Sequence, residues 1–138
     1  MSGNSDAGAL LDSNIVIDYF RRKVDLRGLF ETHNIYLCDI VLGELFGGAC
    51  KSANPDRNKQ QVERLIPTVN ILAKNIETTR IYGEIWTTLA EKGEMIPTND
   101  IWIAALGLQH GLKVITRDKH FEKVPDLNVE GWTQSPLK

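Results

Sequence analysis

Four acidic residues stand at positions where a carboxylate could take part in chemistry. Asp12 follows the apolar run of residues 9–11 and Asp118 follows the β-branched run of residues 113–116, so both are expected beyond the ends of buried strands. Glu44 and Asp100 fall on helical stretches, each on the side that carries apolar residues. A carboxylate that faces inward is unfavourable unless it is paired, hydrogen-bonded or bound to a metal. The pattern predicts that these acids share a site.

Each acid also has a simpler explanation when it is considered alone. Asp12 could cap the helix that follows it, and Asp118 could initiate a turn. Asp100 could sit favourably at a helix N-terminus, and Glu44 could lie at the rim of the domain. The combination favours a shared site, because the edge of a parallel sheet can bring together residues that follow its strands and residues on its helices.

The chemistry that such a site supports is metal-assisted hydrolysis. Neighbouring carboxylates repel one another and raise one another's pKa, and Mg²⁺ or Mn²⁺ relieves this repulsion because both ions favour oxygen ligands. Phosphodiester hydrolysis uses one such ion to activate water and a second, about 4 Å away, to stabilise the leaving oxygen. The 138-residue chain has a net charge of −2, which excludes a protein that coats nucleic acid through overall positive charge.

The elements that must position these acids alternate between strands and helices. Expected strands cover residues 9–11, 34–38, 69–72, 113–116 and 128–129, and expected helices cover residues 15–20, 39–48, 56–65, 75–91 and 97–110. This alternation predicts an α/β fold, a three-layer domain with a mainly parallel central sheet and helices on both faces.

The chain is expected to form one domain. Its composition, 42% hydrophobic and 25% charged, excludes a disordered or fibrous protein. Residues 1–7 are predicted to be a flexible N-terminal segment, in part vector-derived, and residues 8–134 a single domain. We expect no signal peptide, since residues 1–6 lack its basic start and apolar block, and no membrane span, since none of the apolar runs approaches ~20 residues. Cys38 and Cys50 are expected to be reduced thiols, which favours a cytoplasmic location.

Four segments of the chain resemble, in order, the motifs of PIN-domain nucleases. They are LLDSNIVID (residues 10–18), DIVLGEL (39–45), PTNDIWIAA (97–105) and VITRDKHF (114–121). The third and fourth segments, separated by a helix that ends at a glycine, are the most specific. The short chain length and the close match point to the VapC toxins of bacterial and archaeal toxin–antitoxin pairs.

This resemblance implies a Mg²⁺-dependent endoribonuclease, with Mn²⁺ as a substitute metal. Asp12 and Asp100 are then the main metal ligands. Glu44 helps to hold metal or water, and Asp118 completes the site. The resemblance further implies an RNA substrate, a homodimer and a cognate VapB-type antitoxin that blocks the site.

Polar and cationic residues beside the acids complete the predicted site. Asn14 and Thr116 match positions that support the acids in the family. Three basic residues next to Asp118 are candidates for contacts with the substrate: Arg117, Lys119 and His120. The basic run of residues 21–23 could contact RNA phosphates or could simply be a solvated helix end.

Three other interpretations stay open at the level of sequence. An α/β phosphatase or phospho-acceptor domain also places an acid after its first strand, but it usually has a second acid there and a dedicated lysine, and neither is evident. A PIN-like module could bind RNA or a protein without cutting it, although none of the four acids is missing. An α/β scaffold in which the acids never meet is the third possibility.

Overall fold

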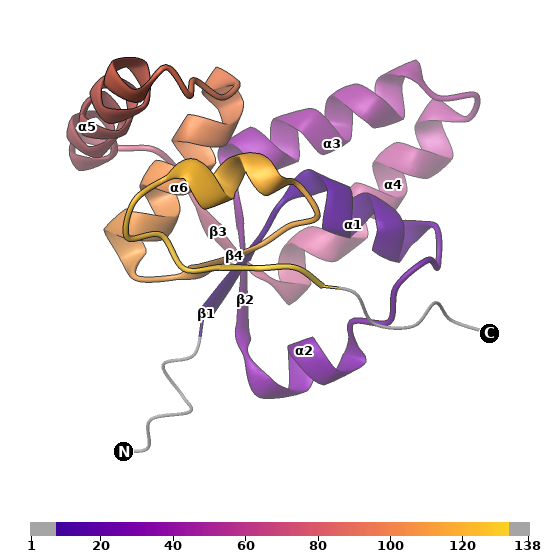
Figure 1. Ribbon diagram of the computed structural model, residues 1–138. Coiled ribbons are helices and arrows are strands. Elements are labelled where there is room, and N and C mark those ends of the chain that lie inside the picture. The colour runs from indigo at the N-terminus through magenta and orange to yellow at the C-terminus, as the bar shows by residue number, and fades with distance from the viewer. Residues whose placement is uncertain (1–7, 133–138) are drawn as a thin grey trace.

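A five-stranded parallel sheet forms the centre of the computed structural model, which describes residues 8–132 (Figure 1). Its strands are β1 (Gly8–Leu11), β2 (Asn34–Cys38), β3 (Asn70–Leu72), β4 (Lys113–Ile115) and β5 (Val129–Glu130). They lie in the order β3-β2-β1-β4-β5, and every pairing between neighbours is parallel. The predicted segment 1–7 and the last two residues of the predicted domain, 133 and 134, lie outside the described residues.

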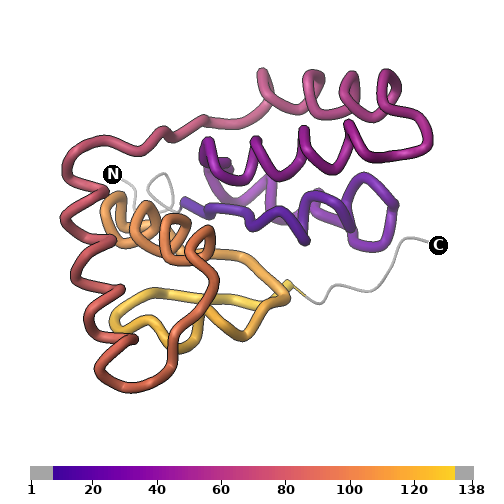
Figure 2. The backbone as a smooth tube through the Cα atoms, turned by 90° about the horizontal axis from the view of Figure 1, so that it is seen from above, coloured from indigo at the N-terminus to yellow at the C-terminus, as the bar shows by residue number. Residues whose placement is uncertain are grey.

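Helices cover both faces of the sheet, so the predicted three-layer α/β fold is confirmed. The helices are α1 (Ser13–Phe20), α2 (Arg27–Thr32), α3 (Asp39–Lys51), α4 (Pro55–Leu65), α5 (Ile76–Lys92) and α6 (Thr98–His110), with 3₁₀ turns η2 (Ile66–Thr68) and η3 (Lys119–Lys123). Figure 2 shows α1, α3 and α4 on one side of the molecule and α5, α6 and η3 on the other. The strand order accounts for this division: the chain runs from β1 through β2 to β3 at one edge and then crosses to β4 and β5 on the other side of β1. The usual right-handed crossover then places the two sets of helices on opposite faces.

Two helices differ from the expected pattern. The short helix α2 was not predicted, since six residues are too few to display a helical apolar stripe. Helix α3 does not end at the glycine pair of residues 47–48 but continues to Lys51. Glycine lowers helix propensity by about 1 kcal/mol, but Leu45 and Ala49 are buried and hold these last turns in place.

The core lies on both faces of the central strands. All four residues of β1 are buried, because this strand has a paired neighbour on each side and helices above and below. Helix α6 is buried along Ile101 and Ile103–Gly107. A Cβ atom at Gly107 would lie only 3.1 Å from side-chain atoms of Val114 and Leu127. The glycine therefore lets α6 approach β4 closely, which fixes the first turn of α6 relative to the sheet.

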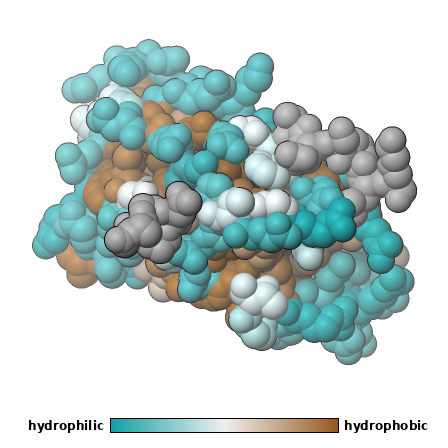
Figure 3. All heavy atoms as spheres, turned by 90° about the horizontal axis from the view of Figure 1, so that it is seen from below, coloured by the Kyte–Doolittle hydropathy of each residue, from teal (hydrophilic) through white to brown (hydrophobic). Residues whose placement is uncertain are grey.

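Hydrophilic and hydrophobic side chains alternate over the face of the molecule seen in Figure 3. In this view from below, hydrophobic patches lie between groups of hydrophilic side chains. Within residues 8–132, no helix is long and apolar enough to cross a membrane. Cys38 and Cys50 are both free, as predicted, and burial raises the pKa of the Cys38 thiol to about 11.

Substitution of a fully buried residue of β1 tests the central place of this strand. Leu10→Ala is expected to lower the free energy of unfolding by about 2–5 kcal/mol, because the cavity at Leu10 is enclosed on all sides. Ile71→Ala, in edge strand β3 where the side chain is 41% exposed, is the control and should cost less than half as much. Urea denaturation measures both values, and equal losses would contradict the assignment of β1 as the centre of the core.

Candidate active site

The carboxyl ends of β1 and β4 bring two of the predicted acids together. Leu11 of β1 pairs with Ile115 of β4, and the backbone N–H of Asp12 donates to the carbonyl of Ile115 at 3.0 Å. Asp12 and Asp118 therefore leave the sheet at the same edge, although 106 positions separate them in the sequence. Asp100 reaches this edge from the first turn of α6.

Asp12 is held in place by three hydrogen-bond donors. Its Oδ2 accepts from Thr116 Oγ1 at 2.7 Å and from Asn14 Nδ2 at 3.2 Å, and its Oδ1 accepts from the backbone N–H of Ser13 at 2.8 Å. The residue is only 4% exposed, and burial raises its pKa in spite of these hydrogen bonds. Asp12 thus caps α1, as expected when it is considered alone. The nearby charge of Asp118 also raises its pKa, so Asp12 belongs to the acidic site as well.

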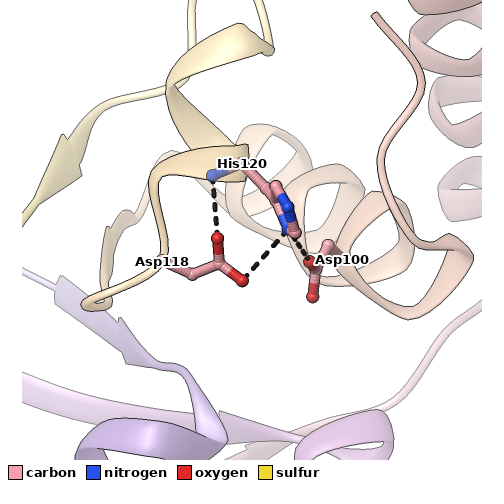
Figure 4. Close-up of side chains that lie close together, drawn as sticks. All are labelled: Asp100, Asp118 and His120. Atoms are coloured by element: carbon pink, nitrogen blue, oxygen red, sulfur yellow. Dashed lines mark hydrogen bonds and ion pairs between the residues drawn. The ribbon is translucent and has the colours of Figure 1, made fainter.

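Asp100, Asp118 and His120 form the tightest group of the site. Figure 4 shows the imidazole of His120 between the two carboxylates, with Nδ1 3.2 Å from Asp100 Oδ2 and 3.1 Å from Asp118 Oδ2. One potential ligand atom from each residue lies within 4.8 Å of the others. Burial, with the nearby charges of Asp12 and Asp118, raises the pKa of Asp100 to about 6, and His120 opposes this shift.

Glu44 lies at the margin of this group. Its Oε2 accepts a hydrogen bond of 3.4 Å from Asn99 Nδ2, and Asn99 immediately precedes Asp100. Its Oε1 is buried and has no hydrogen-bond partner among residues 8–132. A buried acceptor without a partner costs about 1–3 kcal/mol, so this oxygen is available for a ligand that supplies positive charge. The structure therefore brings Asp100 and Asp118 together with His120, and Asp12 is near enough for its charge to act on Asp100. Glu44 lies one side chain away, at Asn99.

The three predicted substrate contacts have different environments. Arg117 forms an ion pair with Asp18, in which Nε lies 2.6 Å from Oδ2 and Nη2 lies 3.3 Å from Oδ1. Lys119 is exposed to solvent. His120 is part of the acidic site itself, because its ring lies between the carboxylates of Asp100 and Asp118. Contact of these residues with a substrate stays a prediction.

Two residues that position the site were not predicted from the sequence. Asp18, at the end of the first motif, is buried and holds Arg117, next to Asp118. Asn99, within the third motif, orients Glu44. Their places inside the motifs were the only signals available, since their partners are 99 and 55 positions away.

Comparison with known proteins identifies the fold and the family. Residues 9–127 match the PIN domain family. The chain belongs to the PIN-domain family. Its curated relatives include "Ribonuclease VapC2" of Rickettsia felis, 30% identical over 129 residues that cover 89% of this chain and 96% of the relative.

Further relatives are named VapC ribonucleases or endonucleases, and solved neighbours include VapBC complexes. The "tRNA(fMet)-specific endonuclease VapC" of Salmonella typhimurium is 32% identical over 127 residues, or 89% of this chain and 96% of that protein. The crystal structure of DNA-bound VapBC from the same species superposes with a TM-score of 0.84 at 29% identity, covering 92% of this chain and 99% of that one. The predicted family is therefore confirmed.

Removal of the Asp100 charge should stabilise the metal-free protein. The folded-state pKa of about 6 exceeds the ordinary value of 3.8, so the folded protein holds this proton more tightly than the unfolded chain does. The free energy of unfolding of the wild type therefore decreases as pH rises from about 4 to about 6, and it stays lower above pH 6. Asp100→Asn should raise the free energy of unfolding in EDTA by about 1–3 kcal/mol at neutral pH, and the gain should vanish near pH 4.

Denaturant unfolding of the wild type and the variant at the two pH values measures this effect. Glu91→Gln, an exposed acid of α5, is the matched control and should change stability little at either pH. A neutral-pH stability of Asp100→Asn equal to that of the wild type would show that the Asp100 charge is not destabilised by its surroundings.

Proposed function

We propose that this chain is the toxin of a VapBC-type pair and acts as a Mg²⁺-dependent endoribonuclease, with Mn²⁺ as a substitute. The observation that carries the proposal is the convergence of Asp12, Asp100 and Asp118 at the carboxyl edge of the sheet, where α/β proteins bind ligands. The ribonuclease and endonuclease names of its VapC relatives agree with this chemistry.

The donor set suits a hard divalent cation. Carboxylate oxygens are the ligands that Mg²⁺ and Mn²⁺ favour, and the buried, unpartnered Oε1 of Glu44 adds an oxygen without a hydrogen bond. Asp12 and Asp100 would be the main ligands, with Asp118 and Glu44 completing the set. When bound, the metal would lower the pKa of the attacking water and offset the negative charge of the phosphate.

The side chains around the acids would fix their orientation during hydrolysis. Thr116 and Asn14 direct Oδ2 of Asp12, and the backbone N–H of His120 donates to Oδ1 of Asp118 at 2.9 Å. Such supporting hydrogen bonds keep ligand oxygens in a single arrangement. The imidazole of His120 is placed to bind a metal or to contact a phosphate oxygen, and Arg117 and Lys119 are proposed as further substrate contacts.

The partners follow from the same assignment. We infer a VapB-type antitoxin, since the related Salmonella structure is described as a VapBC complex bound to DNA. We also infer a homodimer, for which exposed apolar side chains on or near α5 offer a surface: Ile76, Trp86 and Met95. We further infer a cytoplasmic location, which the proposed RNA substrate and the free thiols of Cys38 and Cys50 support.

Cleavage of RNA by the purified chain tests the proposed activity. Total RNA and tRNA(fMet), the RNA named for the Salmonella relative, should both be tried as labelled substrates. Cleavage is expected with Mg²⁺ or Mn²⁺, and EDTA should abolish it. Asp100→Asn should lower the rate at least about 100-fold, because the amide lacks the charge that binds the metal.

The control variant Glu91→Gln should cut RNA at the wild-type rate. Cleavage that survives both EDTA and Asp100→Asn would remove the proposed site from the mechanism. Absence of cleavage with every metal and RNA would favour the alternative of a PIN-like module that binds RNA or protein without cutting.

Divalent metal should also stabilise the folded chain. A ligand that binds only the folded state raises its stability by mass action, about 2.7 kcal/mol at 100 times the Kd. Thermal melting with millimolar Mg²⁺ or Mn²⁺ should therefore show a Tm several degrees above that in EDTA. In Asp100→Asn, metal should raise the Tm much less, although the metal-free variant is expected to be more stable than the metal-free wild type. An unchanged wild-type Tm would argue against a metal site.

A further inference from the structure

A groove beside the acidic site is lined by unpaired cations. Helices α1, α3 and α4 lie side by side and enclose a groove of about 380 Å³, which we term the α1–α4 groove (Figure 2). Glu44 lines its inner end, so the groove opens next to the carboxylates. A Cβ atom at Gly48 would meet nothing within 4 Å, which shows that the floor of the groove at α3 is open.

Three arginines give the α1–α4 groove its charge. Arg21 lies on the α1 side, whereas Arg57 and Arg64 lie on α4, and all three are exposed. None of them forms an ion pair with an acid of residues 8–132. Glu44 is the single acid that lines the groove within that part of the chain. In a protein with a net charge of −2, this is a local concentration of positive charge.

The spacing of the arginines on α4 matches an extended polyanion. Arg57, Gln61 and Arg64 follow one another at intervals of four and three residues and therefore share one face of the helix. Arg57 and Arg64 are two turns apart, about 10 Å along the axis. Phosphates repeat every ~3.4 Å along a strand of a duplex, so these two side chains can meet different phosphates of one strand.

An aromatic side chain continues the line of contacts. An adjoining hollow shares Phe20, Gln61 and Arg64 with the α1–α4 groove and adds Tyr19 and Arg22. Tyr19 is 38% exposed, and its ring lies 6.1 Å from that of Phe20. Single-stranded nucleic acids bind where cations track the backbone and aromatic rings stack on bases.

We propose that the α1–α4 groove binds a single strand of RNA and leads it to the acidic site, with Arg57 and Arg64 contacting its phosphates. The inference rests on the proposed ribonuclease function and assigns the path of its substrate. It also gives a role to Arg21 and Arg22, which the sequence leaves open between a phosphate contact and a solvated helix end. The cations explain how a chain of negative net charge holds a polyanion.

The test measures the salt dependence of RNA binding. The Arg57→Gln/Arg64→Gln double variant is made in an Asp100→Asn background to prevent cleavage, and the probe is a short fluorescein-labelled oligouridine. Each lost phosphate contact should reduce the slope of log K against log salt by about 0.7, so the double variant should be shallower by about 1.4. Arg21→Gln alone, on the other wall of the groove, should reduce the slope by about 0.7.

Arg80→Gln/Lys92→Gln is the matched control, because it removes the same charge from α5, across the molecule from α4 (Figure 2). Its slope should equal that of the parent. Thermal melting should show that all variants remain as folded as the Asp100→Asn parent, since every substituted arginine and lysine is exposed. In the cleaving protein, the groove variant should raise the KM for RNA and leave kcat within about two-fold, as expected for a residue that binds substrate away from the reacting atoms.

The outcomes separate this inference from the proposed function. RNA cleavage by the wild type together with parental slopes and KM in the groove variants would overturn the groove assignment and leave the nuclease intact. Reduced slopes without any wild-type cleavage would support RNA binding in the groove while the nuclease proposal fails. Loss of binding to a VapB-type antitoxin with a parental RNA slope would show that the groove docks a protein, and the RNA assignment would be wrong.

Discussion

The parallel pairing of β1 with β4 is the constraint on which the site depends. It makes Asp12 and Asp118 emerge at one edge of the sheet, and the backbone hydrogen bond from Asp12 to Ile115 fixes the separation of the two segments. Because β1 also pairs with β2, its register is held from both sides. Helix α6 then packs against β4 through Gly107 and delivers Asp100 to the same edge.

This arrangement gathers negative charge in a place where little water is available. Burial raises the pKa of both Asp12 and Asp100, and neighbouring carboxylates add to the shift. Three features offset the free-energy cost of these buried charges. They are the hydrogen-bond donors around Asp12, the His120 imidazole between Asp100 and Asp118, and the large apolar core. The carboxylates of such a site repel one another until a cation binds between them. This repulsion is the physical basis for the proposed binding of a metal ion and an RNA phosphate.

Charge is distributed unevenly over the rest of the molecule. Arg117 is held by Asp18 close to the acids, while Arg21, Arg57 and Arg64 stand without acidic partners of residues 8–132 along the α1–α4 groove. The acids and the free cations thus occupy adjoining regions, joined at Glu44. The arginines of the groove can attract a polyanion, and the acidic site can then hydrolyse it. A small negative net charge is therefore compatible with RNA as the proposed substrate.

The sequence by itself determined where the strands and most helices lie along the chain, the four acids and the PIN-type motifs. These features are local, since an apolar run, a cap residue or a helical stripe involves residues within a few positions of one another. Local patterns were least informative at α2 and at the end of α3, where a six-residue helix and a glycine pair give misleading signals.

Only the tertiary structure decided which side chains meet. Three contacts of the site join residues from different elements. They are the contact of His120 with the two carboxylates, the ion pair of Arg117 with Asp18, and the hydrogen bond from Asn99 to Glu44. The α1–α4 groove likewise needs three helices to lie side by side. Such contacts depend on sheet order and crossover direction, which place residues about 100 positions apart within hydrogen-bond distance and leave no periodic trace in the chain.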